Sequence, residues 1–155
     1  DPTGGGSVVA VNAVSTTFTG IPAAVRWVKV ILDGAKCANP IAIRLGDSGG
    51  LEESGYIGLA QVSNTTVVSE SGAYFTVFLD PTKLSYGYVE FIRVSTGSNR
   101  WISTNLNVMF HTSGSITRFG GGSKTLSGEL TQLALLGING GSSAITGNVS
   151  LVWGY

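Results

Sequence analysis

The placement of glycines limits the folds that this chain can adopt more than any other feature of its sequence. The chain has 23 glycines in 155 residues, about twice the usual frequency of roughly 7%. They fall in short clusters between apolar stretches that alternate with polar residues or run for roughly four to nine residues. This punctuation is typical of short strands joined by turns. The sequence therefore predicts an all-β domain.

The predicted strands are rich in β-branched and aromatic residues. They cover residues 7–12, 15–19, 25–32, 41–45, 56–62, 74–79, 88–94, 100–103, 106–111, 130–138 and 149–153. Turns are expected at 33–34, 96–99, 120–122 and 139–141, where Gly, Asn, Asp and Ser cluster. About ten strands with such turns predict an antiparallel β-sandwich that is jelly-roll-like.

The strand predicted at 25–32 is apolar on both sides. Successive side chains of a strand point to opposite faces of its sheet. One face carries Val25, Trp27, Lys29 and Ile31, and the other carries Arg26, Val28, Val30 and Leu32. Because neither face is clearly polar, we expect one to be covered by a second sheet and the other by a neighbouring subunit.

The segment 127–137 also fits a helix. It has a possible N-cap at Ser127, helical spacing of Leu130, Leu133 and Ala134, and a glycine at its end. Periodicity alone leaves helix and strand equally favoured here.

Composition narrows the range of partners. At 16.0 kDa the chain has the size of one domain, 1–155, with residues 1–6 as a flexible glycine-rich lead-in. Nine basic residues balance nine acidic ones, and only 12% of residues are charged. This argues against nucleic acid and anionic lipid as partners, and no apolar run is long enough to cross a bilayer. Asp1 in place of a methionine indicates a processed product or a fragment.

The single cysteine, Cys37, excludes an internal disulfide framework and a multi-cysteine zinc site. We expect a half-buried thiol. The core or oligomerisation must then hold the fold, and no cofactor is expected.

Residues 46–50, Gly-Asp-Ser-Gly-Gly, spell the segment around the nucleophile of trypsin-like proteases. Those enzymes need a histidine upstream of the serine. Here the only histidine, His111, lies downstream of Ser48 in an apolar strand, and the chain is too short for paired barrels. We therefore interpret the motif as a turn in which Asp47 or Ser48 caps backbone amides and glycines adopt positive φ.

Other chemistry is weakly indicated. Asp47, Glu52 and Glu53 match no known calcium loop, and three scattered carboxylates are typical of a solvated turn. A glycosidase needs two paired acids, and nothing in the sequence pairs any two of them. We predict no catalytic residue, no metal site and no enzymatic activity.

Aromatic residues supply the remaining candidates for binding. Tyr86, Tyr88, Trp101, Trp153 and Tyr155 stand in or near polar segments, where rings stack on sugar faces while polar neighbours bind hydroxyls. Core packing is the commoner fate of a strand aromatic. The candidate ligand-binding residues are Tyr86, Tyr88, Asn99, Arg100 and Trp101.

Several runs spread from Phe18 to the end of the chain resemble one family. They are 18–22 (FTGIP), 43–50 (IRLGDSGG) continuing to 54–56 (SGY), 99–101 (NRW) and 122–128 (GSKTLSG). They look like bacteriophage tail-fibre and related virion proteins, in which a β-sandwich domain carries these phrases and ends in a Leu-Ser-Gly strand and a short terminal strand. The chain departs from this pattern after Gly137, where 139–143 replaces the usual Asp-containing turn.

The resemblance implies a receptor-binding domain at the end of a tail fibre, on the surface of the virion. Such a domain is usually a homotrimer that attaches to a bacterial surface glycan or protein. The resemblance also favours a strand at 130–138 and explains residues 46–50 as a family turn. The alternative is a capsid or tail decoration protein that binds other virion proteins.

Overall fold

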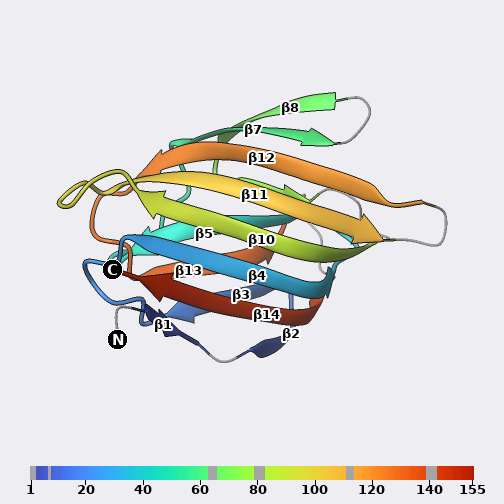
Figure 1. Ribbon diagram of the computed structural model, residues 1–155, viewed down its shortest axis with the longest axis horizontal. Coiled ribbons are helices and arrows are strands. Elements are labelled where there is room, and N and C mark those ends of the chain that lie inside the picture. Colours follow the sequence, from blue (N-terminus) through green and yellow to red (C-terminus); the bar gives the residue numbers. More distant parts are fainter. Residues whose placement is uncertain (1–2, 7, 63–65, 79–82, 111–113, 139–142) are drawn as a thin grey trace.

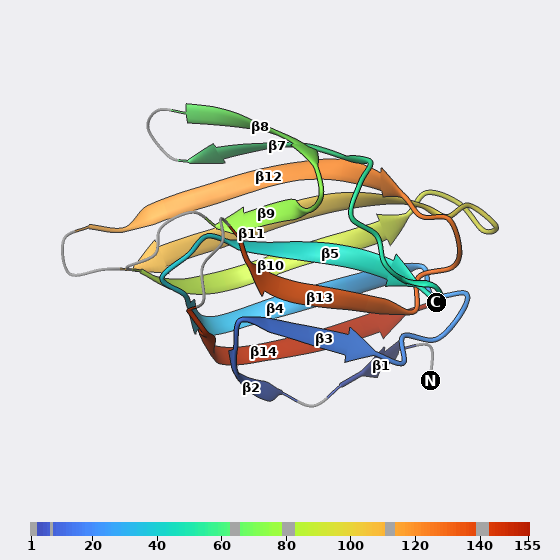
Figure 2. The same ribbon diagram turned by 180° about the vertical axis from the view of Figure 1, so that it is seen from behind.

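Two antiparallel β-sheets packed face to face form the whole of the described structure (Figures 1 and 2). The computed structural model describes residues 3–6, 8–62, 66–78, 83–110, 114–138 and 143–155. These residues include no helix, and hence none that could span a membrane. The prediction of an all-β sandwich is confirmed.

The larger sheet has nine strands in the order β1-β14-β4-β10-β11-β12-β7-β8, and β2 also pairs with β14. Its strands are β1 (Thr3–Gly5), β2 (Val9–Ala13), β4 (Trp27–Lys36), β7 (Tyr56–Val62), β8 (Thr66–Gly72), β10 (Leu84–Arg93), β11 (Arg100–Phe110), β12 (Ile116–Thr125) and β14 (Ile145–Gly154). The lead-in at 1–6 therefore contributes Thr3–Gly5 as a strand paired with the end of β14.

The smaller sheet has five strands in the order β3-β13-β5-β6, and β9 pairs with β5. Its strands are β3 (Ser15–Thr19), β5 (Ile41–Asp47), β6 (Gly50–Leu51), β9 (Phe75–Phe78) and β13 (Gln132–Gly137). Most connections carry the chain from one sheet to the other, as expected for a jelly-roll-like sandwich.

The core lies between the sheets. In β4 the alternation predicted from sequence is confirmed from Trp27 onward, because Val28, Val30 and Leu32 are buried. It is wrong before the strand begins, where Val25 is buried in the core and Arg26 is exposed. Leu45 of β5 and Leu133 of β13 are buried in the same core cluster. Burial of each such side chain contributes roughly 1.5–3 kcal/mol to folding.

The helix alternative for 127–137 is wrong. The strand β13 pairs with β3 on one side and β5 on the other. Leu133, Ala134 and Leu135 are all fully buried. A strand between two partners has its backbone donors and acceptors satisfied on both edges, which outweighs helical spacing. The strands predicted at 100–103 and 106–111 fall on the continuous strand β11, Arg100–Phe110, and residue 111 lies outside the described residues.

Of the predicted turns, 96–99 is confirmed as the connection between β10 and β11, with Gly97 at φ 81°. Residues 33–34 instead lie within β4, where the register with its neighbours shifts and Gly34 has φ 69°. The turn predicted at 139–141 falls outside the described residues. Cys37, expected half-buried, is fully buried.

The turn predicted at 120–122 is wrong, because these glycines lie in the middle of β12 between β11 and β7. A Cβ atom at Gly120 would lie 2.6 Å from the carbonyl oxygen of Leu59. At Gly122 it would collide with the carbonyl oxygen of Ile57. The glycines therefore serve close approach of neighbouring strands.

We expect Gly122→Ala to lower the free energy of unfolding by about 3 kcal/mol, because the new methyl group forces β7 and β12 apart. Urea unfolding followed by circular dichroism measures the change. Gly6→Ala is the matched control, since a Cβ there has only an ordinary contact at 3.9 Å. Equal stability of the two variants would contradict the close-approach explanation.

Candidate functional site

The protease-like segment forms the turn between β5 and β6, as interpreted from the sequence. The Asp47 carboxylate accepts hydrogen bonds from the Gly49 amide and the Ser127 hydroxyl, both at 2.7 Å. Gly50 has φ 125°, and Ser48 is exposed. These hydrogen bonds, that from Ser127 first, lower the pKa of Asp47. The single histidine, His111, lies outside the described residues.

A second carboxylate, that of Glu52, also accepts a hydrogen bond from Ser127 and forms a polar corner together with Asp47. The ammonium group of Lys124 and the amide of Ser127 both donate to the carboxylate of Glu52. Burial by itself raises the pKa of Glu52, but these hydrogen bonds and the charge of Lys124 outweigh it and leave the pKa lowered. Beside them, burial raises the pKa of Tyr56 to about 12, and its hydroxyl accepts from the Leu45 amide at 2.8 Å.

The three acids weighed as a calcium site are all engaged by protein groups, and Asp47 and Glu52 share Ser127 as a donor. Asp47 and Glu52 are held as described above, and Glu53 pairs with Arg44 at 2.7 Å. Within the described ranges no group of three His, Cys, Asp or Glu side chains gathers into a metal-binding set. This corner therefore ties the connection between β12 and β13 to the turn after β5.

We predict that Asp47→Ala lowers the free energy of unfolding by about 1–2 kcal/mol at pH 7, because it removes a charged acceptor from two donors. A carboxyl group with a lowered pKa in the folded state stabilises the fold above its ordinary pKa of 3.8. That contribution disappears as the pH falls through the lowered value. The variant and the wild type should therefore converge in acid.

Urea titrations at pH 7 and near pH 3 measure both stabilities. Ser48→Ala, which removes an exposed hydroxyl from the same turn, is expected to change stability by less than about 0.5 kcal/mol. A difference between Asp47→Ala and wild type that persists unchanged in acid would disprove the charge-based explanation.

The five residues predicted to bind a ligand do not form one site. Tyr86 and Tyr88 lie on the outer face of β10, where Tyr86 packs edge-on against Phe110 at 5.8 Å between ring centroids. The Lys29 ammonium lies 4.7 Å from the centre of the Tyr88 ring. Asn99 and Arg100 are at the start of β11, roughly 25 Å along the sheet from Tyr86.

Trp101 requires a correction. Its side chain is 1% exposed and belongs to the core between the sheets, so its ring cannot stack on a sugar. Core packing, the alternative weighed for strand aromatics, holds for this residue. Trp153 is half-buried and packs against the same core, whereas Tyr155 at the end of the chain is exposed.

The outer face of the larger sheet is the main unexpected feature. Along β11, Ile102, Leu106 and Phe110 point outward, whereas Ser103 and Asn107 are buried on the inner side. Neighbouring strands continue the apolar surface. We call this surface the outer apolar face; its members, 37–67% exposed, are Ile31, Ile57, Leu59, Leu84, Tyr86, Ile92, Ile102, Leu106, Phe110 and Phe119.

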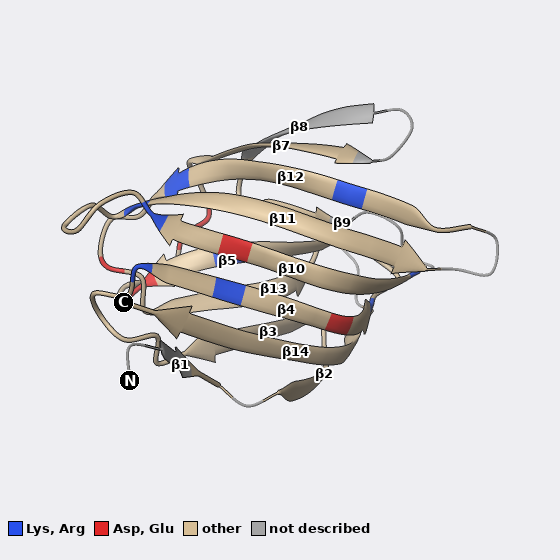
Figure 3. Cartoon of the chain, in the orientation of Figure 1, with Lys and Arg blue, Asp and Glu red and all other residues tan. Residues whose placement is uncertain are grey.

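Few charges interrupt the outer apolar face, which Figure 3 views from outside. At its margin on the β4 side, Lys29 of β4 pairs with Glu90 of β10 at 3.3 Å. Asp33 is exposed further along β4, and Arg100 is exposed at the start of β11. Among these four groups opposite charges balance.

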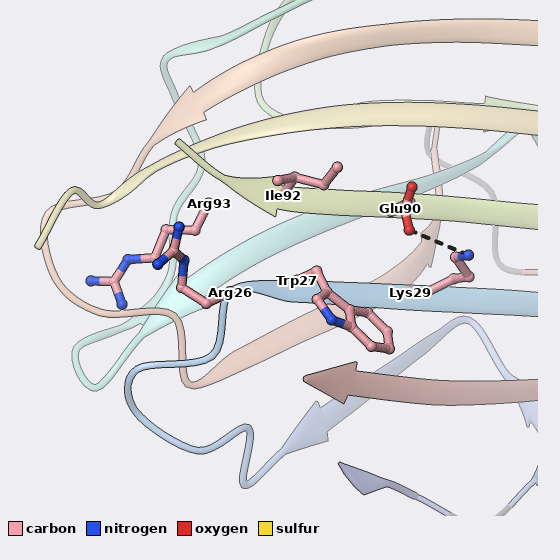
Figure 4. A pocket seen from close by; sticks show the side chains of 6 residues that line it. All are labelled: Arg26, Trp27, Lys29, Glu90, Ile92 and Arg93. Atoms are coloured by element: carbon pink, nitrogen blue, oxygen red, sulfur yellow. Dashed lines mark ion pairs between the residues drawn. The ribbon is translucent and has the colours of Figure 1, made fainter. Parts of the chain in front are cut away.

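Two depressions mark the same side of the sheet. One, of about 540 Å³, lies over the glycines of β12 and is bordered by Ile57, Leu59, Ile102 and Arg100. We call it the glycine hollow. The other, of about 310 Å³, is lined by Arg26, Trp27, Lys29, Glu90, Ile92 and Arg93 (Figure 4). We call it the Trp27 pocket.

Sequence reasoning missed both depressions. Trp27 was placed correctly on the face of its strand opposite Val28 and Val30, but it was not considered as a ligand contact. Apolar and polar residues alternate along 102–110 in the sequence, but apolar side chains are normally assigned to the core, so the pattern does not predict an apolar outer face.

Comparison of the chain with protein-family models, curated proteins and solved structures found no match. Its function is therefore argued from its own residues.

Proposed function

We propose that this chain is a non-enzymatic bacteriophage virion protein, a tail-fibre domain that assembles as a homotrimer and attaches to the bacterial surface. The observation that carries the proposal is the outer apolar face. Soluble monomers rarely expose contiguous apolar patches larger than a few hundred Å². A surface of this kind is suited to binding and assembly.

The size of the outer apolar face fits a stable interface. A whole side chain of this kind presents roughly 175 Å², so ten side chains about half exposed present roughly 800 Å². Standard interfaces bury roughly 800 Å² on each partner. Packing against another protein surface would remove this area from water at about 25 cal/mol per Å².

A second copy of the same chain is the occupant that the charges favour. The Lys29–Glu90 pair at the β4 margin is neutral as a unit, and exposed Asp33 and Arg100 have opposite signs. A partner of strong net charge would find no complement on this face. A copy of the chain brings the same balanced pattern, with an acidic group available to meet each basic one.

The glycine hollow supports packing between different parts of two copies. It offers an apolar depression of about 540 Å³, while Phe110 and Phe119 are bulky exposed side chains on the same face. A hollow on one copy that receives such a ring from the next makes a heterologous contact. Repeated around a threefold axis, contacts of this kind close into a ring.

We expect wild-type protein at micromolar concentration to be a trimer and Leu106→Lys to be a folded monomer, because a lysine ammonium buried at the interface has no partner. Native mass spectrometry measures the state and circular dichroism checks the fold. Thr17→Lys, at an exposed site on the smaller sheet, is the control and should stay trimeric. Monomeric wild type, or trimeric Leu106→Lys, would contradict assembly through this face.

Attachment to the host follows from the resemblance to tail-fibre proteins. Three copies in one fibre, and several fibres on one particle, would convert weak single-site binding into firm attachment by avidity. A protein that decorates the capsid or tail would use the same sandwich to contact other virion proteins. The place of the chain on the particle distinguishes the two functions.

Gold-labelled antibody against this chain, applied to intact phage particles that contain it, tests the location by electron microscopy. We expect label at the fibre tips. Label spread over the capsid or the tail shaft would replace the attachment function with decoration, and label on no particle would overturn both.

A further inference from the structure

The Trp27 pocket combines an aromatic ring with charged groups from two adjacent strands. Trp27 pairs in register with Ile92, and Lys29 with Glu90, so these four side chains stand on the same outer side of β4 and β10. Figure 4 shows the indole ring between the arginines at the start of β4 and the Lys29–Glu90 pair. The pocket opens at the end of the sheet, where β4 begins and β10 ends.

The indole ring of Trp27 is held against the backbone of the neighbouring strand. A Cβ atom at Gly154 would lie 2.6–2.7 Å from three indole atoms, Nε1, Cε2 and Cζ2. These three atoms form one edge of the indole, so a side chain at position 154 would collide with that edge. Because Gly154 has no side chain, the ring has room beside β14 and lines the pocket. The ring is thus pre-positioned as a platform.

The charged side chains of the pocket differ in how many hydrogen bonds and ion pairs they already make within the protein. Arg93 is buried and donates to the Ser98 carbonyl at 2.5 Å and to Glu129 at 3.1 Å. Lys29 and Glu90 pair with each other. Arg26 is exposed, and its Nη1 donates to the Thr96 hydroxyl at 2.7 Å. A guanidinium group has five N–H donors, so this bond leaves others directed to solvent.

We propose that the Trp27 pocket binds an acidic sugar residue of a bacterial surface polysaccharide. The apolar C–H face of the sugar ring stacks on the indole, and the carboxylate accepts hydrogen bonds from Arg26, which suits planar carboxylates. Lys29 and Glu90 lie on the far side of the ring, where they reach sugar hydroxyls. This inference rests on the proposed attachment function and names the chemical class of its receptor.

The location of the pocket is compatible with assembly through the outer apolar face. The glycine hollow and the strands β7, β11 and β12 lie on the other side of β10 from Trp27. Copies packed over those strands leave the start of β4 at the rim. Each fibre would then present three equivalent pockets, as avidity requires.

Two probes that differ only in charge test the ligand class. Methyl glucuronoside and methyl glucoside share one ring shape, but only the first has a carboxylate. In saturation-transfer NMR titrations we expect the wild type to bind the glucuronoside at least about tenfold more tightly, a difference of about 1.4 kcal/mol. Equal binding of the two sugars would replace the acidic class with neutral sugars, and no binding of either would overturn the site.

Substitutions then assign the contacts. Trp27→Ala should weaken binding of both sugars at least about tenfold, whereas Arg26→Gln should weaken only the glucuronoside and remove its preference. Thr17→Ala is the control, since Thr17 is exposed on the smaller sheet, away from both the pocket and the outer apolar face. If Trp27→Ala unfolds, Trp27→Phe keeps a smaller ring and should show intermediate affinity.

Binding to host cells separates a failure of this site from a failure of the proposed function. If Trp27→Ala loses sugar binding and the labelled trimer no longer attaches to cells, both proposals stand. If the variant attaches as well as the wild type, the Trp27 pocket is not the receptor site, although attachment stands. Wild-type protein that attaches to no host cell would overturn both.

Discussion

A strand in a sandwich has two faces, and only one of them can reach the core between the sheets. How the larger sheet meets this rule decides what its outer surface is made of. In β4 the inner positions are apolar, but in β11 three of the five are polar: Ser103, Asn105 and Asn107 lie between Trp101 and Met109. A shift of β11 by one residue would reverse its faces, but it would also expose Trp101. The larger sheet therefore keeps apolar side chains on its outside.

Glycine links the fold to the candidate sites. In β12 it allows β7 and β11 to approach, and the absence of side chains there leaves a hollow on the outer face. At Gly154 it allows the Trp27 ring to lie beside the neighbouring strand. Meanwhile the Gly-Asp-Ser-Gly-Gly segment, which matches a protease motif in letters, uses its aspartate as a cap. The same residue type thus shapes a strand contact, a ring platform and a turn.

Prediction from sequence succeeded for features that adjacent residues determine. The capping role of Asp47 and the hairpin turn at 96–99 follow from the chemistry of adjacent residues, and both are confirmed. Prediction failed for features that depend on pairing with strands far away in the sequence. The glycines at 120–122 look like a turn until β7 and β11 are placed beside them, and Trp101 looks accessible until β11 is placed in register. The residues proposed to bind a ligand were chosen by type, and the fold separated them along the sheet.

The all-β class and most strand positions follow from short-range patterns of glycine and β-branched residues, and the near-neutral charge follows from composition, so all three could be predicted from the sequence. The outward face of β11, and the position of Trp27 rather than Trp101 at the surface beside charged groups, become visible only in the folded chain. The period of two separates the faces of a strand without saying which one meets the core. Pairing with strands far away in the chain makes that choice, and no local pattern contains it.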